Sequence, residues 1–346
     1  MYFSIALILG TTYCFELQEY YSQSPCDSLT GITVPYTEGR NVNDLNDTDF
    51  AQGDTIYLAG SVKLNPGEKP LKIKDDYTTW IGLDLAGIID VFPPTITEDK
   101  CPDKYSPLQV SASNVKIKDI GFIRFIKGIP ETQHPCTDYS RFYPVGIRGD
   151  WVTMEGVNVG FLILGGAYDN PIKAYAPDDC IKLTGDFGGG GNFFTLVDSY
   201  ISSCGESGLD AVGEDCITVK NTWFNDTANG AISIKGGSSN VFLAGNFMWH
   251  TEGIQLGGNS SSEFQENCSY HVTNAYLLNN FSFDPIKIAG ADSVVMESNY
   301  MDFYEAKGRI IGEGPCSASD TLRNGYIKNT NAGDINMWHE QWRKNF

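Results

Sequence analysis

Alternating apolar and polar positions dominate the middle of the chain, from Tyr143 to Gly290, in short segments that end in glycine. Within a segment two apolar residues lie two positions apart, as Ile232 and Ile234 do, and this period predicts a β-strand with one buried face. The segments are PVGIRG (144–149), CIKLTG (180–185), GLDAVG (208–213), AISIKG (231–236), GIQLGG (253–258) and PIKIAG (285–290). They begin 36, 28, 23, 22 and 32 residues apart, without a helical pattern, which predicts a β-solenoid of stacked coils.

A second alternating run follows each glycine-ended segment and adds two columns to the repeat. The first column is small and polar: Asn158, Ser199, Thr222, Asn246, Asn280 and Asn299. The residue after each is mostly aromatic: Val159, Tyr200, Trp223, Phe247, Phe281 and Tyr300. Stacked amides can satisfy one another at a turn, and stacked rings bury much apolar surface. The sequence therefore predicts an all-β parallel β-helix (solenoid) with an Asn ladder and an aromatic stack.

One solenoid domain is expected, because a solenoid grows in one dimension. The predicted parts are a signal peptide over 1–15, an N-terminal lead-in or cap over 16–50, the β-helix over 51–325 and a C-terminal cap over 326–346. Residues 1–15 are a short apolar run typical of a secretory signal, with a buried first strand as the alternative. No other run is long enough to span a membrane. Two tryptophans, Trp338 and Trp342, predict a short capping helix in the tail.

Cysteines and glycosylation sequons fit a secreted, extracellular protein. If Cys14 leaves with the signal, eight cysteines remain, which predicts up to four disulfides of unknown pairing. Cys101 and Cys136 flank one coil and could staple its loops. Sequons at Asn46, Asn225, Asn259 and Asn267 are expected sites of modification. The sequon at Asn280 is not, because that residue belongs to the predicted ladder.

The net charge of −19 argues against a nucleic-acid partner. It leaves room for a local cationic groove that binds an anionic substrate. The excursions at 160–177 and 258–271 interrupt the repeat, and loops on a rigid scaffold usually build the site.

Outward positions of the glycine-ended strands hold the candidate chemistry. The first outward column is Gln109, Gly146, Lys182, Asp210, Ser233, Gln255, Lys287 and Arg309. The second is Ser111, Arg148, Thr184, Val212, Lys235, Gly257 and Ala289. Neighbouring coils lie about 4.8 Å apart, so Lys182, Asp210, Lys235 and Gln255 are predicted to form one patch, with Arg148 at its N-terminal edge. Three further carboxylates enter from the turns before Lys182 and Asp210: Asp178, Asp179 and Glu206.

This patch suits β-elimination on a uronate, which needs a neutralised carboxylate, a base for the C5 proton and an acid for the leaving oxygen. A lysine between other cations can have a lowered pKa and act as the base. The catalytic candidates are Lys235, Lys182 and Arg148, and the substrate-binding candidates are Gln255, Lys287 and His250. Oxygen ligands for Ca²⁺ could come from Asp178, Asp179, Asp210 and Glu206. The structural alternative is a set of cross-strand ion pairs on a solvated face.

The coil pattern, the Asn ladder and the aromatic stack resemble the pectate-lyase-like superfamily over about residues 107–312. This resemblance implies a single-stranded right-handed parallel β-helix. The stretch NGAISIKGGSSNVFLAGNFMWHTEGIQLGG (229–258) resembles bacterial right-handed β-helix repeat proteins and, more distantly, polysaccharide lyases of the chondroitinase-B and alginate-lyase type. Those lyases use Lys as base and Arg as acid on adjacent coils, with Ca²⁺ or basic residues at the carboxylate. Lys235 falls where they carry a catalytic cation, but Asp210 stands where its partner is expected.

Two other functions remain open beside a lyase. DDCIKL (178–183) is similar to the paired-Asp motif of polygalacturonases, and inverting hydrolysis needs such a carboxylate pair. However, Asp210 follows the pair instead of preceding it, and no Gly-His-Gly or Arg-Ile-Lys follows. The incomplete catalytic set also fits a non-catalytic, glycan-binding β-helix scaffold. The favoured prediction is a secreted monomer that cleaves an acidic polysaccharide by lyase chemistry.

Overall fold

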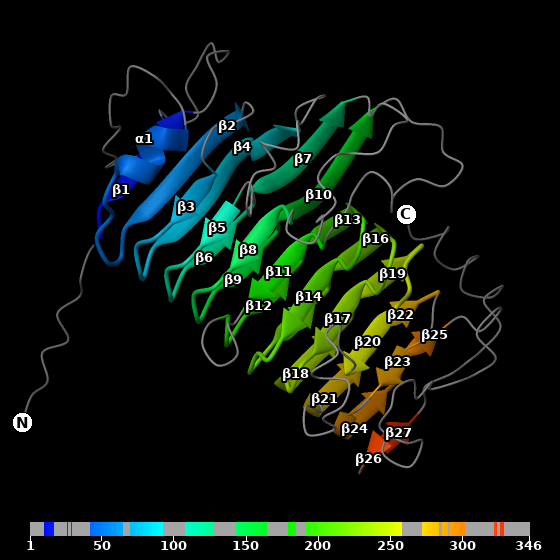
Figure 1. The fold of residues 1–346 in the computed structure, drawn as a ribbon. Coiled ribbons are helices and arrows are strands. Elements are labelled where there is room, and N and C mark those ends of the chain that lie inside the picture. Colours follow the sequence, from blue (N-terminus) through cyan, green and yellow to red (C-terminus); the bar gives the residue numbers. More distant parts are fainter. Residues whose placement is uncertain are drawn as a thin grey trace, which may run out of the picture.

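Parallel strands stack coil upon coil along the whole fold (Figure 1). The computed structural model describes residues 10–16, 26, 29, 42–64, 70–92, 108–127, 143–164, 179–184, 191–257, 272–283, 286–289, 291–301, 322–323 and 326–328. Consecutive coils pair in parallel with residues in register, for example Lys182 with Asp210 and Tyr200 with Trp223. The predicted parallel β-helix is therefore confirmed.

The glycine-ended segments form one sheet of the coil, here called sheet B. Its eight strands are β3 (Leu71–Ile73), β5 (Leu108–Val110), β8 (Val145–Ile147), β11 (Ile181–Thr184), β14 (Leu209–Val212), β17 (Ile232–Lys235), β20 (Ile254–Gly257) and β23 (Ile286–Ala289). The register confirms the first outward column from Gln109 to Lys287, since each member pairs with the next. The last predicted member, Arg309, lies outside the described residues.

The second run of each coil forms two strands, not one, and these belong to the larger sheet A. The strand pairs are β6 (Lys116–Lys118) and β7 (Gly121–Lys127), β9 (Thr153–Glu155) and β10 (Asn158–Leu164), β12 (Thr195–Val197) and β13 (Tyr200–Cys204), β15 (Thr218–Lys220) and β16 (Trp223–Thr227), β18 (Ser239–Ala244) and β19 (Phe247–Trp249), β21 (Val272–Leu278) and β22 (Phe281–Ser282), and β24 (Ala291–Glu297) and β25 (Tyr300–Met301). Because β10 continues to Leu164, the excursion predicted from residue 160 begins later than expected.

A residue in the left-handed conformation turns the chain between the two strands of each pair. This corner residue is Asp119, Gly156, Asp198, Asn221, Gly245, Asn279 or Ser298. Asn, Asp and Gly enter that region with little strain, which explains their use here. At Gly245 space also matters, because a Cβ atom would lie 2.7 Å from Oδ1 of Asn221.

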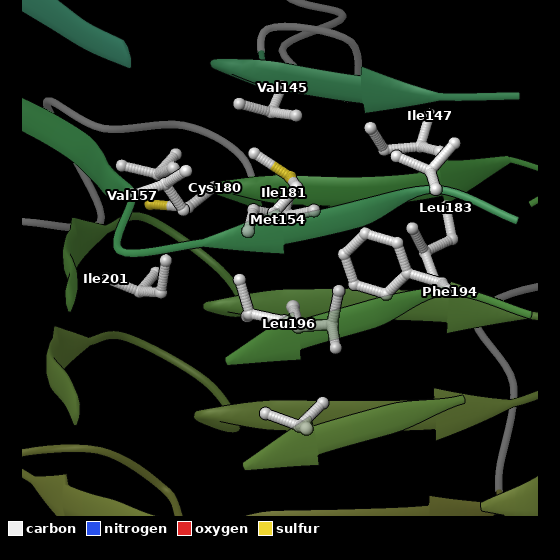
Figure 2. Close-up of a cluster of buried hydrophobic side chains, with 14 of the residues drawn as sticks. Val145, Ile147, Met154, Val157, Cys180, Ile181, Leu183, Phe194, Leu196 and Ile201 are labelled. Carbon is white, nitrogen blue, oxygen red and sulfur yellow. The ribbon is translucent and has the colours of Figure 1, made fainter. Parts of the chain in front are cut away.

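The core lies between the sheets and runs the length of the stack. Figure 2 shows side chains of sheet B facing those of sheet A, and the labelled residues are Val145, Ile147, Met154, Val157, Cys180, Ile181, Leu183, Phe194, Leu196 and Ile201. All ten residues are at most 1% exposed. This follows from the two-residue period, which sends alternate side chains inward on every strand.

The polar ladder is confirmed from Ser199 to Asn299. The side-chain oxygens of Ser199, Asn246, Asn280 and Asn299 each accept a backbone N–H from the coil before them, whereas the hydroxyl of Thr222 donates to the carbonyl of Lys220. Oδ1 of Asn280 also accepts from Nδ2 of Asn246 at 2.9 Å. The prediction was wrong for Asn158 and Val159, because Asn158 pairs with Tyr200 and is exposed. Val157 occupies the ladder position instead, since the ladder residue directly follows the corner residue, here Gly156.

The aromatic stack lies on the outside of the coil. Tyr200 and Trp223 are exposed, and neighbouring rings from Tyr200 to Tyr300 have centroids 4.8–6.0 Å apart. The reason is the pleat: the residue after an inward ladder residue must point outward. The rings contact edge to face from Tyr200 to Phe247 and face to face from Phe247 to Tyr300, and the column does not enter the core.

Regular secondary structure is present in the regions predicted as the two end segments of the chain. Thr12–Glu16 form β1, which pairs with β2 (Thr55–Leu64), and β2 pairs with β4 (Thr79–Phe92). Residues 12–16 thus form a strand, with Cys14 and Phe15 buried, and the signal peptide over 1–15 stays a prediction. Helix α1 (Val42–Asp47) lies against β3 within the predicted irregular lead-in. At the other end β26 (Leu322–Arg323) and β27 (Tyr326–Lys328) pair with β24, and the predicted capping helix lies outside the described residues.

Among the described residues there are two disulfides, Cys14–Cys26 and Cys180–Cys204, which suits an oxidising compartment. Cys14, which lies in the predicted signal, is bonded to Cys26, and Cys216 is a free thiol. The other four cysteines, among them the predicted Cys101 and Cys136 staple, lie outside the described residues. In the described part of the chain no helix is long and apolar enough to cross a membrane.

Of the sequons, Asn280 is buried in the ladder, as expected. Asn225 is half-buried on β16. The amide nitrogen of Asn46 already donates to the carbonyl of Pro70 at 2.8 Å. Asn259 and Asn267 lie outside the described residues. Whether any of these asparagines carries a glycan stays a prediction.

Candidate functional site

Two lysines and two aspartates form a chain of ion pairs on the outward face of sheet B. Nζ of Lys182 lies 2.9 Å from Oδ2 of Asp179 and is also in direct contact with Oδ2 of Asp210. Nζ of Lys235 lies 2.8 Å from Oδ1 of Asp210. We call these four residues the Lys–Asp cluster. It brings together β11, β14 and β17 (Figure 1), as the outward columns predicted.

Only the lysines of this cluster reach the surface. The side chains of Asp179 and Asp210 are 1% and 2% exposed, whereas those of Lys182 and Lys235 are 24% and 16% exposed. A ligand that approaches sheet B can therefore contact the lysine side chains but not the buried carboxylates. Cationic side chains at a surface are what an anionic sugar requires, and these two are partly exposed on a chain of net charge −19.

The two carboxylates have pKa values displaced in opposite directions. Burial and then the nearby charge of Asp210 raise the pKa of Asp179 to about 6, although Lys182 acts against this shift. Burial also opposes ionisation of Asp210, but the ammoniums of Lys182 and Lys235 outweigh burial and hold its pKa below the usual range. Asp210 is thus the charged centre of the cluster, and Asp179 is the group that titrates near neutral pH.

Lys182 is held in its charged form. Burial alone would lower its pKa, but the carboxylates of Asp210 and Asp179 outweigh burial and raise the pKa above its usual range. The sequence suggested a lysine between cations that could act as a base, and for Lys182 this expectation fails because its neighbours are carboxylates. Lys182 is suited to bind and neutralise an anion.

The stability of the protein is expected to fall as pH rises from about 4 to about 6. In that window folded Asp179 still binds a proton that its unfolded counterpart, with a pKa near 3.8, has released. The change should amount to roughly 1–3 kcal/mol, since one pKa unit corresponds to about 1.4 kcal/mol. Urea midpoints measured at several pH values test this, and in Asp179→Asn the slope should be absent. An equal slope in both proteins would assign it to other groups.

The turn that carries Asp179 is tied to the following coils. Oδ1 of Asp179 accepts the backbone N–H of Ser207 at 2.9 Å, and the hydroxyls of Ser207 and Ser233 lie 3.0 Å apart. The disulfide between Cys180 and Cys204 closes the same turn. Ser233 was predicted in the outward column, but Ser207 was not predicted as part of the site. Ser207 lies two residues before Leu209 of β14, as Asp179 does before Ile181 of β11, and this match was the available signal.

Other predicted residues are not joined to the cluster by any contact of the described residues. Arg148 is exposed and stands three coils from Lys235 in the second outward column, about 14 Å by strand spacing. Gln255 pairs with Ser233, but its Nε2 donates to its own strand at Gly257. Lys287 follows Gln255 in the column, and its side chain is outside the described part.

Three turn residues complete the predicted set. Glu206 is exposed in the turn before β14. His250 is exposed in the turn before β20, where Nδ1 lies 3.1 Å from Oδ1 of Asp226, and no contact among the described residues joins it to the cluster. Asp178 lies outside the described residues. The sequence therefore predicted the four residues of the Lys–Asp cluster. No contact among the described residues joins the other predicted site residues to it.

The carboxylates of the cluster do not fit a Ca²⁺ site. Both oxygens of Asp210 face lysine ammoniums, and both oxygens of Asp179 accept hydrogen bonds from Lys182 or Ser207. A calcium ion needs six to eight oxygen ligands and would compete with these contacts. Among the residues that the structure describes, no three acidic, His or Cys side chains are grouped as metal ligands. No catalytic step is therefore derived through calcium.

Comparison with known proteins gives weak structural likeness only. No family model matches the sequence, and no curated protein matches it. A mannuronic-acid-specific polysaccharide family 6 lyase from human gut microbiota is similar at 10% identity and a TM-score of 0.35, over 97% of this chain and 94% of that one. PfbA, a surface adhesin of Streptococcus pneumoniae, is similar at 11% identity and a TM-score of 0.29, over 81% and 84%. At these scores the likeness carries no argument, and the β-helix assignment rests on the strand pairing.

Proposed function

We propose that this protein is a secreted lyase that cleaves a uronate-containing polysaccharide by β-elimination at the Lys–Asp cluster. One observation carries the proposal: the side chains of Lys182 and Lys235 are partly exposed and share the buried carboxylate of Asp210. A uronate carboxylate is an anion that Lys182 can bind, and neutralising it is the first requirement of elimination.

The two lysines take different roles in this proposal. Lys182 contacts two carboxylates and stays charged, so it binds the substrate carboxylate and stabilises the negative charge that develops on it. Lys235 contacts only Asp210 among the described residues, and this proposal assigns it the role of the base. It removes the C5 proton, the C4–C5 double bond forms, and the C4–O glycosidic bond breaks. Water protonates the leaving oxygen.

Hydrolysis is a second candidate, favoured by the opposite displacement of the pKa values of Asp179 and Asp210. A carboxyl with a raised pKa beside an ionised one is the arrangement of an acid and a base in glycosidases. Their burial weighs against it, since a substrate must first displace the lysines to reach them.

A panel assay of the purified protein tests both candidates. Pectate, alginate and glycosaminoglycans are offered with Ca²⁺ and with chelator, while ultraviolet absorbance of an unsaturated uronate and reducing ends are followed in parallel. Rising absorbance that is lost in Lys235→Ala but kept in Lys220→Ala, an exposed lysine of β15, would support the lyase. Reducing ends without absorbance would favour hydrolysis. Silence in both channels, with glycan binding retained, would favour the non-catalytic scaffold.

A further inference from the structure

A column of half-buried and exposed residues runs beside sheet B, where each coil passes from sheet B to sheet A. All six residues have positive φ, and backbone hydrogen bonds fix their order, because the N–H of each residue from Tyr77 to Cys216 donates to the next coil at 2.8–3.0 Å. The column is Tyr77, Asn114, Trp151, Phe193, Cys216 and Asn240. Three of these six residues are aromatic.

The aromatic side chains of Trp151 and Tyr77 are not packed in the core. Trp151 is 54% exposed and Tyr77 is 49% exposed, with φ of 59° at both. The left-handed region is strained for a bulky side chain, and Gly, Asn or Asp would fill it more favourably. Backbone strain combined with exposed apolar surface indicates a role outside the fold.

The rings are arranged to leave one face of Trp151 uncovered. Trp151 and Phe193, from neighbouring coils, lie parallel with centroids 3.8 Å apart and an interplanar angle of 3°. Because Phe193 belongs to the next coil, the indole plane is roughly perpendicular to the direction in which the coils stack. The other face of the indole is therefore turned toward the preceding coil, which carries Asn114. Tyr77 lies on the coil before that of Asn114, two coils from Trp151. The backbones at Tyr77 and Trp151 are therefore about 9.6 Å apart, which is two strand spacings, with the short side chain of Asn114 on the coil between them.

Carboxylates hold this turn rigid and set the charge around it. Oδ1 of Asp150 accepts from N and Nδ2 of Asn192 at 3.0 and 3.2 Å, and Oδ1 of Asp76 accepts the N–H of Ser113 at 2.7 Å. Within the described part of the chain the second oxygen of Asp150 has no hydrogen bond, so it can accept one from a ligand. Ionised carboxylates accept and do not donate, so a ligand here must offer hydrogen-bond donors and carry no negative charge.

We propose that Tyr77, Asn114, Trp151 and Asp150 form a binding site for a neutral pyranose ring. The apolar face of the sugar would lie on the free face of Trp151, between the levels of Trp151 and Tyr77, and a ring hydroxyl would donate to Asp150. The site differs from the Lys–Asp cluster in place and in the charge that it accepts. It does not depend on the function proposed above.

Titration calorimetry and tryptophan fluorescence of the full chain test this site. The probes are neutral linear hexasaccharides of glucose, xylose, mannose and galactose, with a hexauronate and tetramethylammonium as comparisons. At least one neutral hexasaccharide should bind, and Trp151→Ala should weaken binding about tenfold or more, the loss expected for one ring-stacking contact. Trp151→Gly should give the same loss, and because Gly accepts this φ, the result does not depend on a strained alanine.

The matched control is Trp223→Ala, which removes a Trp 39% exposed in the outer stack and should leave binding unchanged. Lys235→Ala should also leave it unchanged, which separates this site from the cluster. Three results would overturn the proposal: no binding of any neutral hexasaccharide, equal losses in Trp151→Ala and Trp223→Ala, or Trp151-dependent binding of tetramethylammonium, which would make it a cation site.

Discussion

Replacing Asp210 with alanine is expected to lower the free energy of unfolding by about 3–5 kcal/mol, the loss typical of a broken buried ion pair. Asp210 is 2% exposed and is the shared counter-charge of Lys182 and Lys235. Without it, Lys235 loses its carboxylate partner among the described residues and Lys182 keeps only Asp179. Urea unfolding, followed by circular dichroism at pH 7, measures the change.

Two further variants show whether the loss comes from unpaired charge. Asp226→Asn removes the charge of a more exposed carboxylate, which contacts solvent-facing His250 and the amide of Asn225, and because Asn accepts the φ of 52° it should change stability by less than about 0.5 kcal/mol. Combining Asp210→Leu and Asp179→Asn with Lys182→Met and Lys235→Met removes all four charges together and should restore much of the lost stability. A small effect of Asp210→Ala alone would mean that water reaches the cluster and screens its charges.

The energetics of the cluster decide which residue is best used to test activity. Asp210 and Lys182 each contact two members, so their removal changes stability and chemistry together. Lys235 stands at the end of the chain of contacts, and its removal leaves the pair between Lys182 and Asp210 intact. Loss of activity in Lys235→Ala with an unchanged fold would therefore report on chemistry.

The fold could be predicted because its signals are periodic and local. A two-residue period marks every strand of sheet B, and the spacing of the glycine-ended segments aligns the coils. The corners could not be found this way, because Gly156, Asp198 and Asn221 differ in type and share only a backbone conformation. The misplaced Asn158 shows the consequence, since a slip of one residue exchanges the inward and outward faces.

The candidate site could be predicted in position but not in environment. Strand register alone brings Lys182, Asp210 and Lys235 to adjacent coils. Which oxygen meets which ammonium, and how deeply each lies, depends on side-chain conformations that the sequence does not specify. The expected lysine base among cations failed at Lys182 for this reason. Trp151 was likewise overlooked, because an exposed aromatic at a turn has no periodic signal.

Replacing Asn280 with alanine is expected to lower the free energy of unfolding by about 3–5 kcal/mol, because several buried polar groups would lose their partners at about 1–3 kcal/mol each. Its side chain makes four hydrogen bonds. Oδ1 accepts from N and Nδ2 of Asn246 at 3.2 and 2.9 Å, and Nδ2 donates to Leu243 and to Asn299 at 2.9 Å. Asn280 is 2% exposed, so water cannot replace these bonds.

Asn158→Ala is the matched control for the ladder. Asn158 has the same side chain and was aligned with the ladder by sequence, but it is exposed on β10. Its replacement should change the urea midpoint by less than about 0.5 kcal/mol in equivalent free energy. If both substitutions proved equally mild, the stacked amides would add little to the coil. If only Asn280→Ala unfolded at lower urea concentration, the ladder would stabilise the C-terminal coils by satisfying buried polar groups at their corners. In the N-terminal coils the same position holds an apolar side chain, such as Val157.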